Sequence, residues 1–226
     1  MGYQWDFSVV WRNSHLLLWG LVGTLKVTAA ALALGLPLGL TVALLRLSRA
    51  RAVSLPAGVF VEFFRSTPPL VQLFWCFFAL PILIGVRIDS FQAAVMTLSL
   101  QSSAFFAEVF RGGIVSVERG QWEAARAVGM TYSQLMRRVV LPQAVKRMIP
   151  DFLERAIELM KTTTLVATVA YADLLFEASD IAQKTFRPLE VFTAAAAIYF
   201  IVIFAASRAV QVFERRLARS GESTAH

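Results

Sequence analysis

The stretch VTAAALALGLPLGLTVALL, residues 27–45, contains no charged side chain. Three further uncharged blocks follow along the chain, at residues 66–86, 90–107 and 191–207. A membrane-spanning α-helix needs about 20 mostly apolar residues, whereas a helix of that length in a soluble protein shows a polar stripe. The four blocks therefore predict membrane spans, and the predicted fold class is an all-α, polytopic membrane protein.

The overall composition supports this class. Of the 226 residues, 57% are hydrophobic, and the mean hydropathy is +0.62; soluble domains are nearer 45–50% apolar. The formal net charge of +7 would suggest nucleic acid as a partner of a soluble protein, but here the basic residues flank the apolar blocks. The single cysteine, Cys76, cannot form an internal disulfide.

We expect one membrane-embedded permease domain, residues 1–226, with five spans. The second span should break at Thr67–Pro69, because proline removes a backbone donor and clashes with the preceding turn. The helix of the fourth span should begin after Pro150, or as early as Gln143, with an amphipathic first half. The predicted spans cover about residues 15–45, 55–81, 91–111, 150–176 and 189–213, with a polar loop at about 112–145.

Basic residues fall mainly on one side of this predicted topology. Fourteen of them lie at residues 46–51, 111–147 and 208–219. The opposite side holds four, which are Arg12, Arg87, Lys184 and Arg187. Because Lys and Arg mark cytoplasmic segments, we expect a periplasmic N-terminus, and a long loop and C-terminus in the cytoplasm.

The long loop contains EAARAVGMTYSQLMRRVVLP, residues 123–142. Its alanines are strong helix formers, so we expect a short helix over Gln121–Val128. Gly129 fits the left-handed residue that stops a helix. A second helix should cover Tyr132–Val140, capped by Thr131 or Ser133, and Pro142 marks its end or the start of another helix.

This loop resembles the signature loop of permease subunits of type I ABC importers. The family pattern is Glu-Ala-Ala, three residues, Gly, nine residues, Ile, one residue, Leu-Pro. At that spacing the chain has Glu123, Ala124, Ala125, Gly129, Val139 in place of Ile, Leu141 and Pro142.

Other stretches resemble the polar amino acid uptake subfamily, the glutamate/aspartate/glutamine/histidine-type permeases. They are VEFFRSTPPLVQLF at residues 61–74, AEVFRGGI at 107–114, RGQWEAARAVGM at 119–130, LPQAVKRMIP at 141–150 and LMKTTTLVATVAYADLL at 159–175. In the last stretch many members carry Asp where this chain has Thr162, and Ser where it has Thr164. Because of this departure, the family's substrate contacts are not assigned residue by residue to this stretch.

The resemblance implies a permease of the bacterial inner membrane, paired with an identical or homologous second permease. Two ABC ATPase subunits would dock in the cytoplasm, and a periplasmic solute-binding protein would deliver a polar amino acid or similar zwitterion. The helix at residues 121–128 would be the coupling helix. The ATPase-coupling residues carried over from the pattern are Glu123, Ala124, Ala125, Gly129, Leu141 and Pro142.

We expect the chain to be neither an enzyme nor the binder of a cofactor. The sequence has no Gly-rich loop ending in Gly-Lys-Ser/Thr, so the partner ATPase would bind ATP and Mg²⁺. The two histidines, His15 and His226, lie far apart in the sequence, and no metal site is expected. A membrane enzyme would need a nucleophile–base pair or a metal cluster, and neither is visible. The remaining alternative is a stand-alone secondary transporter or channel for small polar solutes.

Polar groups inside spans are costly and therefore mark functional positions. Glu158 and Lys161 are three residues apart and share a helical face. Their opposite charges would suit a zwitterion, or they would only neutralise each other at a subunit seam. The substrate-path candidates are Gln72, Gln101, Ser102, Glu158, Lys161, Thr162 and Thr163.

A second set of intramembrane charges suggests structural ion pairs. Glu62 and Arg65 are three residues apart on one helix, and we expect them to pair. Glu108 could pair with Arg65 or Arg111. These four residues are therefore the candidates for a structural rather than a transport role.

Overall fold

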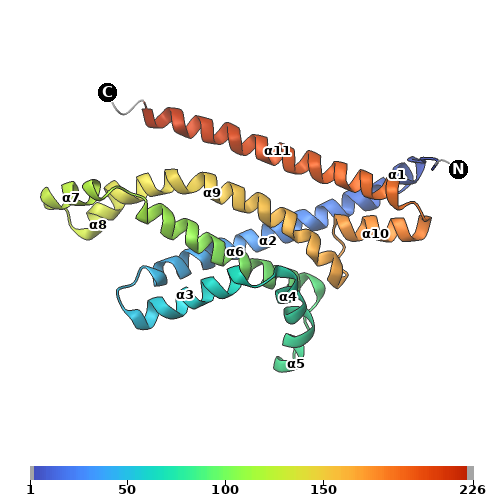
Figure 1. The fold of residues 1–226 in the computed structure, drawn as a ribbon, viewed down its shortest axis with the longest axis horizontal. Helices are drawn as coiled ribbons and strands as arrows, with labels where there is room; N and C mark the ends of the chain where they lie inside the picture. The colour runs from blue at the N-terminus through green and yellow to red at the C-terminus, as the bar shows by residue number, and fades with distance from the viewer. Residues whose placement is uncertain (1–2, 223–226) are drawn as a thin grey trace. The chain divides into compact units, whose positions relative to one another are not determined.

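The computed structural model describes residues 3–222, so the chain ends, including His226, lie outside the described part. Within those residues every regular element is helical (Figure 1). The elements are α1 (Ser8–Arg12), α2 (Ser14–Arg46), α3 (Arg51–Ser66), α4 (Pro69–Phe74), the π-helical η1 (Trp75–Ala79), α5 (Leu80–Ile84), α6 (Ser90–Val115), α7 (Arg119–Ala127), α8 (Tyr132–Leu135), the π-helical η2 (Met136–Val140), α9 (Leu141–Thr162), the 3₁₀-helical η3 (Thr163–Val169), α10 (Leu174–Thr185) and α11 (Pro188–Glu222).

The predicted break at Thr67–Pro69 is confirmed. Helix α3 ends at Ser66, Pro68 has extended backbone angles, and α4 begins at Pro69. Proline is tolerated in the first turn of a helix, where its missing N–H has no partner to lose. The side-chain amide of Gln72 donates to the main-chain oxygen of Thr67 at 3.1 Å, which satisfies a carbonyl that the break leaves without a helical partner.

The contacts divide the described chain into two compact units. Unit 1 comprises the described residues within 1–33, 67–99 and 157–207, and unit 2 those within 34–66, 100–156 and 208–226. Helices α2, α6, α9 and α11 each contribute residues to both units.

Unit 1 contains two hydrophobic clusters. One joins α2, α4, α6, α9 and η3, and its fully or nearly fully buried residues include Val27, Ala93, Leu98 and Val166. The other packs α10 against the beginnings of α2 and α11, through Leu17, Leu174, Ile181 and Val191. Small residues such as alanine let the helices of membrane proteins approach closely.

One glycine of unit 1 is required by a close backbone contact. A Cβ atom built on Gly23 of α2 would lie 2.2 Å from the main-chain oxygen of Ala172. The segment before α10 is held to α2 at the same level, since the main-chain N–H of Leu174 donates to the Thr24 hydroxyl at 3.2 Å. Any side chain at position 23 would force the two segments apart.

Unit 2 also contains two hydrophobic clusters. The first packs the last turns of α2 against α3 and α6, through Val42, Val61, Ala104 and Ala107. The second packs the end of α6 against the α7–α8 loop and the beginning of α9; its buried residues include Ala125, Leu135, Val140, Ala144 and Met148.

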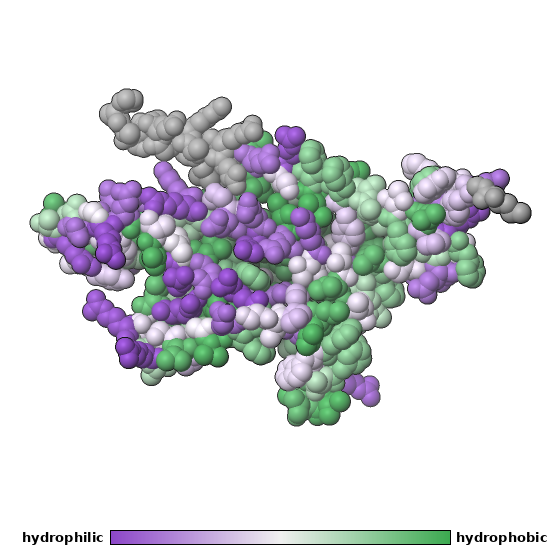
Figure 2. Space-filling model, viewed as in Figure 1, coloured by the Kyte–Doolittle hydropathy of each residue, from purple (hydrophilic) through white to green (hydrophobic). Residues whose placement is uncertain are grey.

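Three described helices are long and apolar enough to cross a membrane: α2, α6 and residues 188–212 of α11. A fourth span results if α3 and residues 69–84 count as one broken span. Helix α9 does not reach the same apolarity, and hydrophilic residues gather over it in Figure 2. The all-α membrane fold is confirmed, while the number of five spans stays a prediction.

The fourth predicted helix begins near the earlier of its two expected starts, Gln143, but ends well before Phe176. Helix α9 begins at Leu141 and passes through Pro150, and its α-helical part ends at Thr162. Beyond it the chain tightens into η3, where the hydroxyls of Thr163, Thr164 and Thr168 donate to carbonyls three residues earlier, at 2.6–2.9 Å. Such hydroxyl bonds compete with regular helix, which explains why the apolar pattern alone overestimated the length of this helix.

Candidate functional site

The α7–α8 loop is a helical hairpin within unit 2, capped by its own hydrogen bonds. Helix α7 ends in two hydrogen bonds, from the N–H of Gly129 to the oxygen of Arg126 at 3.0 Å and from the N–H of Met130 to the oxygen of Ala125 at 3.1 Å. This is the Schellman pattern, and it requires a left-handed residue at its centre. Gly129 has φ +75°, as expected from the sequence.

A reciprocal capping box begins α8. The main-chain N–H of Gln134 donates to the Thr131 hydroxyl at 3.4 Å, and the Thr131 N–H donates to the Gln134 side-chain oxygen at 2.9 Å. The predicted helix over Tyr132–Val140 is present as α8 followed by η2. It runs directly into α9, so Pro142 lies in the first turn of a new helix rather than at a free end.

The hairpin separates an inner face from an outer face. Ala125 is 5% exposed and packs into the second cluster of unit 2, whereas Glu123 and Ala124 are exposed. Leu141 and Pro142 are exposed at the beginning of α9. Of the six coupling candidates, Glu123, Ala124, Leu141 and Pro142 are therefore exposed, while Ala125 is buried and Gly129 supplies the left-handed residue of the turn.

An open cavity of about 550 Å³ lies beside the hairpin. Its lining includes Trp122, Glu123 and Arg126 of α7, Tyr132 of α8, and residues from the ends of α2 and α6. The cavity therefore exposes both charge signs and aromatic surface next to the outer face of α7.

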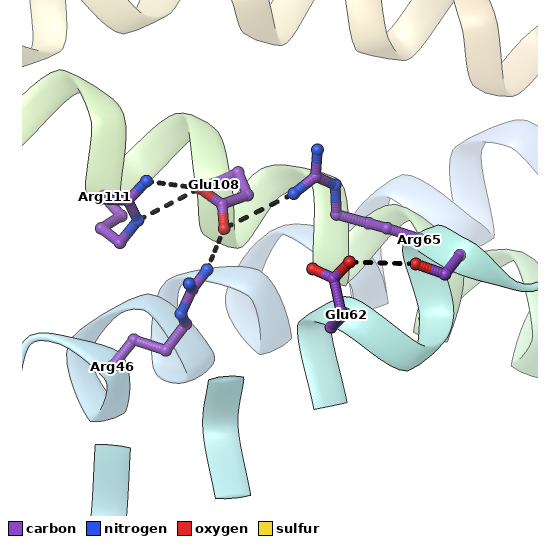
Figure 3. Close-up of polar contacts among 6 residues, drawn as sticks. Arg46, Glu62, Arg65, Glu108 and Arg111 are labelled. Atoms are coloured by element: carbon purple, nitrogen blue, oxygen red, sulfur yellow. Dashed lines mark hydrogen bonds and ion pairs between the residues drawn. The ribbon is translucent and has the colours of Figure 1, made fainter. Parts of the chain in front are cut away.

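The candidate ion-pair residues form a cluster centred on Glu108 (Figure 3). Arg111 donates two hydrogen bonds to one carboxylate oxygen, from Nε at 3.1 Å and from a terminal nitrogen at 2.8 Å. Arg46 of α2 donates to the other oxygen. A terminal nitrogen of Arg65 lies 3.7 Å from that same oxygen. One carboxylate of α6 thus joins α2 and α3 to its own helix.

Glu62 does not form the expected pair with Arg65. It accepts a hydrogen bond from the Ser66 hydroxyl at 3.1 Å on the exposed side of α3, while Arg65 is directed to Glu108 (Figure 3). Arg46 was missed by sequence reasoning because it lies 62 residues from its partner. Only its position at the end of an apolar block marked it, and that signal indicated topology.

A smaller polar cavity of about 260 Å³ adjoins this cluster. Its wall includes Arg65 and Glu108, together with Phe105 of α6. The guanidinium carbon of Arg155 lies 4.8 Å from the centre of the Phe105 ring and that of Arg65 lies 5.7 Å from it. Asp151 and Glu154 of α9 complete the polar part of the lining.

The substrate-path candidates fall in both units. In unit 1, Gln72 is 7% exposed and Thr163 is fully buried, and their elements α4 and η3 pack together. Lys161 is exposed and forms no ion pair with the side chains described within residues 3–212, so a direct pair with Glu158, one of the two alternatives, is not present there. The Thr162 hydroxyl donates to the main-chain oxygen of Glu158 at 2.9 Å.

In unit 2, Gln101 and Ser102 lie on α6 and are 8% and 6% exposed. Both are buried polar side chains in a membrane helix, which is costly unless they are hydrogen-bonded or functional. One further buried polar group, the Thr97 hydroxyl on α6 in unit 1, was not singled out by the sequence. It makes no hydrogen bond within the described part of the chain.

Comparisons with known proteins agree with this architecture. Residues 35–219 match the family model described as "Binding-protein-dependent transport system inner membrane component". The glutamine transport system permease protein GlnP of Escherichia coli (strain K12) is 35% identical over 215 residues, covering 95% of this chain and 98% of that protein. The arginine transport system permease protein ArtQ of Bacillus subtilis (strain 168) is 34% identical over 212 residues, covering 94% and 97%.

Solved structures show the same fold. A chain from a crystal structure of an amino acid ABC transporter with histidines superposes with a TM-score of 0.91 at 37% identity, covering 95% of this chain and all of the other. A chain of the MetNI methionine ABC transporter gives a TM-score of 0.74 at 22% identity, which speaks to the fold alone. The chain belongs to the family of inner membrane components of binding-protein-dependent transport systems.

Proposed function

We propose that the chain is the permease subunit of an ABC importer that moves a polar amino acid or similar zwitterion from the periplasm to the cytoplasm. The observation that carries the proposal is the α7–α8 hairpin, in which a motif shared with importer permeases folds into a hydrogen-bonded pair of helices with an exposed outer face. A stand-alone carrier or channel would have no use for such a hairpin. Transport is therefore coupled to ATP hydrolysis on separate ATPase subunits, and this chain is not itself an enzyme.

The substrate class is supported by the relatives. Two of them are named for glutamine and arginine, and others are named for octopine and cystine. These solutes share an amino acid backbone with a carboxylate and an α-nitrogen, and they differ in the groups attached to it. Buried polar side chains such as that of Gln101 on α6 are groups of the kind that could hydrogen-bond such a zwitterion.

The same proposal covers partners, cofactors and location. A second permease, identical or homologous, completes the translocation pathway, two ATPase subunits bind ATP and Mg²⁺, and a periplasmic solute-binding protein delivers the substrate. The chain itself holds no cofactor. It lies in the bacterial inner membrane with its N-terminus in the periplasm and its C-terminus in the cytoplasm, which the distribution of basic residues supports.

Two variants at Gly129 test the coupling role. Gly129→Val should lose the ATPase subunits in a mild-detergent pull-down from the native membrane, because a β-branched residue does not tolerate φ +75°. Gly129→Asn is the matched control, since asparagine adopts the left-handed conformation readily, and it should retain them. If the wild-type chain retains no ATPase under any mild condition, or transports solute without ATP after purification, the importer proposal is wrong.

A further inference from the structure

The turn between α10 and α11 contains a residue in an unfavourable backbone conformation. Phe186 is the C-cap of α10 and has φ +55° and ψ +32°. The left-handed region suits glycine, because a side chain there brings Cβ too close to the backbone. Bulky residues with positive φ are uncommon and persist where the surroundings fix them, often at functional positions.

The Phe186 side chain contributes nothing visible to the fold. It is 86% exposed, more than any other large hydrophobic residue for which exposure is described. Its ring takes part in no aromatic pair or cation–π contact with the side chains described within residues 3–212. Glycine would relieve the strain here without losing a described contact, so the fold gives no reason for a phenylalanine.

The turn itself is firmly held. Glu190, in the first turn of α11, is fully buried. Its carboxylate accepts hydrogen bonds from the Tyr3 hydroxyl at 2.5 Å and from the main-chain N–H of Asp6 at 3.0 Å. Arg187, next to the exposed ring, lies 3.4 Å from the same carboxylate and donates to the main-chain oxygen of Gln4 at 2.8 Å. The N-terminal segment thus braces the turn through Arg187 and Glu190.

Charged residues flank Phe186 in the sequence. Lys184, 72% exposed, pairs with Asp180 at 2.6 Å, and Arg187 follows the ring directly in sequence. Full charges in the same short turn are unfavourable in hydrocarbon, which argues against immersion of this turn in lipid. An exposed aromatic side chain within a polar rim is instead the usual arrangement of a protein-binding hot spot.

We propose that Phe186 is the anchor by which this permease binds the solute-binding protein of its import system. The inference rests on the proposed function and on the periplasmic side assigned to the α10–α11 turn by the basic residues. The family description itself names dependence on a binding protein. The ring enters an apolar recess on the solute-binding protein, and the strained, braced turn presents it without a loss of mobility on binding.

The test uses the complete importer in lipid nanodiscs, with its ATPase, second permease and solute-binding protein. The measured quantity is the concentration of solute-binding protein that gives half-maximal stimulation of ATP hydrolysis. Phe186→Gly should raise this concentration at least tenfold, because loss of a hot-spot aromatic weakens binding strongly. Phe186→Tyr, which keeps the ring, should stay within about threefold of wild type.

Two further measurements distinguish a loss of docking from a loss of folding. Phe186→Gly should leave basal ATP hydrolysis unchanged and should not lower the melting temperature, since glycine relieves the left-handed strain. An unchanged half-maximal concentration in this variant overturns the inference while leaving the importer proposal intact. A wild-type complex that no solute-binding protein stimulates would instead overturn the proposed function.

A labelling experiment excludes a lipid contact. The only cysteine of the chain, Cys76, is buried, so Phe186→Cys offers one accessible thiol. A membrane-impermeant maleimide added from the periplasmic side should label this variant quickly, and an excess of solute-binding protein should protect it. Rapid labelling without protection, or slow labelling typical of a thiol within the bilayer, would contradict docking at this residue.

Discussion

Replacing Glu108 with glutamine should cost more stability than any other single polar substitution in its cluster. The carboxylate receives one hydrogen bond from Arg46 and two from Arg111, and Arg65 lies 3.7 Å away. Glu108→Gln removes the one negative charge that these three guanidinium groups share. They would then repel one another around a neutral amide.

The size of the effect follows from the burial of the cluster. Breaking a fully buried ion pair costs about 3–5 kcal/mol, whereas exposed pairs contribute about 0–1 kcal/mol. The Glu108 side chain is 22% exposed, and those of Arg46 and Arg111 are 23% and 36% exposed. We therefore expect a loss of about 2–3 kcal/mol in unfolding free energy for Glu108→Gln, between these two limits.

Two other variants calibrate this estimate. Arg111→Gln leaves Glu108 with Arg46 and Arg65, and it should cost only about 1 kcal/mol. Glu62→Gln alters an exposed carboxylate whose described partner is Ser66, and it should cost less than about 0.5 kcal/mol. Denaturant titrations in one mild detergent, followed by intrinsic fluorescence, measure all three. The reasoning is refuted if Glu108→Gln costs no more than Arg111→Gln.

Three further predictions concern unit 1. Gly23→Ala should lower the unfolding free energy by about 1–3 kcal/mol, because its Cβ would lie 2.2 Å from a main-chain oxygen. Gly58→Ala is the control: Gly58 lies in unit 2 with open space around it, so this change should be neutral or slightly stabilising in the same titration. Thr97→Val replaces a buried hydroxyl that makes no described hydrogen bond, so the unfolding free energy should stay equal or rise by up to about 1 kcal/mol. A loss above about 1 kcal/mol would contradict this and would indicate that the hydroxyl does have a hydrogen-bond partner. Burial, followed by the charge of Asp180, raises the pKa of Glu177 above its usual value near 4.5. Ionisation of Glu177 therefore disfavours the folded state. Protonated Glu177 contributes to stability below the usual pKa near 4.5, and this contribution is lost as pH rises through the raised pKa of the folded state. The melting temperature of Glu177→Gln relative to wild type, scanned from pH 4 to 7, should rise across that window, and a flat or falling difference would contradict the burial effect.

Features with local causes could be predicted from the sequence. The helix break at Thr67–Pro69 follows from proline chemistry, and the left-handed conformation of Gly129 follows from its place after an alanine-rich helix. Both need only a few neighbouring residues. The apolar blocks likewise identified α2, α6 and the first part of α11, because span length depends on hydropathy alone.

Features that depend on distant residues were missed. The pairing of Arg46 with Glu108 joins two helices, and no periodicity within either helix indicates it. The start of α9 was predicted only as one of two alternatives, after Pro150 or as early as Gln143, and the structure agrees with the earlier one. A proline usually ends a helix, but here the helix had already begun at Leu141, within a segment that packs against the α7–α8 loop. The assignment of single side chains to the substrate path has the same difficulty and stays a prediction.

The way the chain passes between its two units has a consequence for proteolysis. Of the five passages, four lie inside the continuous helices α2, α6, α9 and α11, and one lies at the break between Ser66 and Thr67. A protease that cuts this break would produce two fragments, and each would hold helices of both units. Neither unit can therefore be released or replaced as a module, and fragments 1–66 and 67–226 would have to be produced together to assemble.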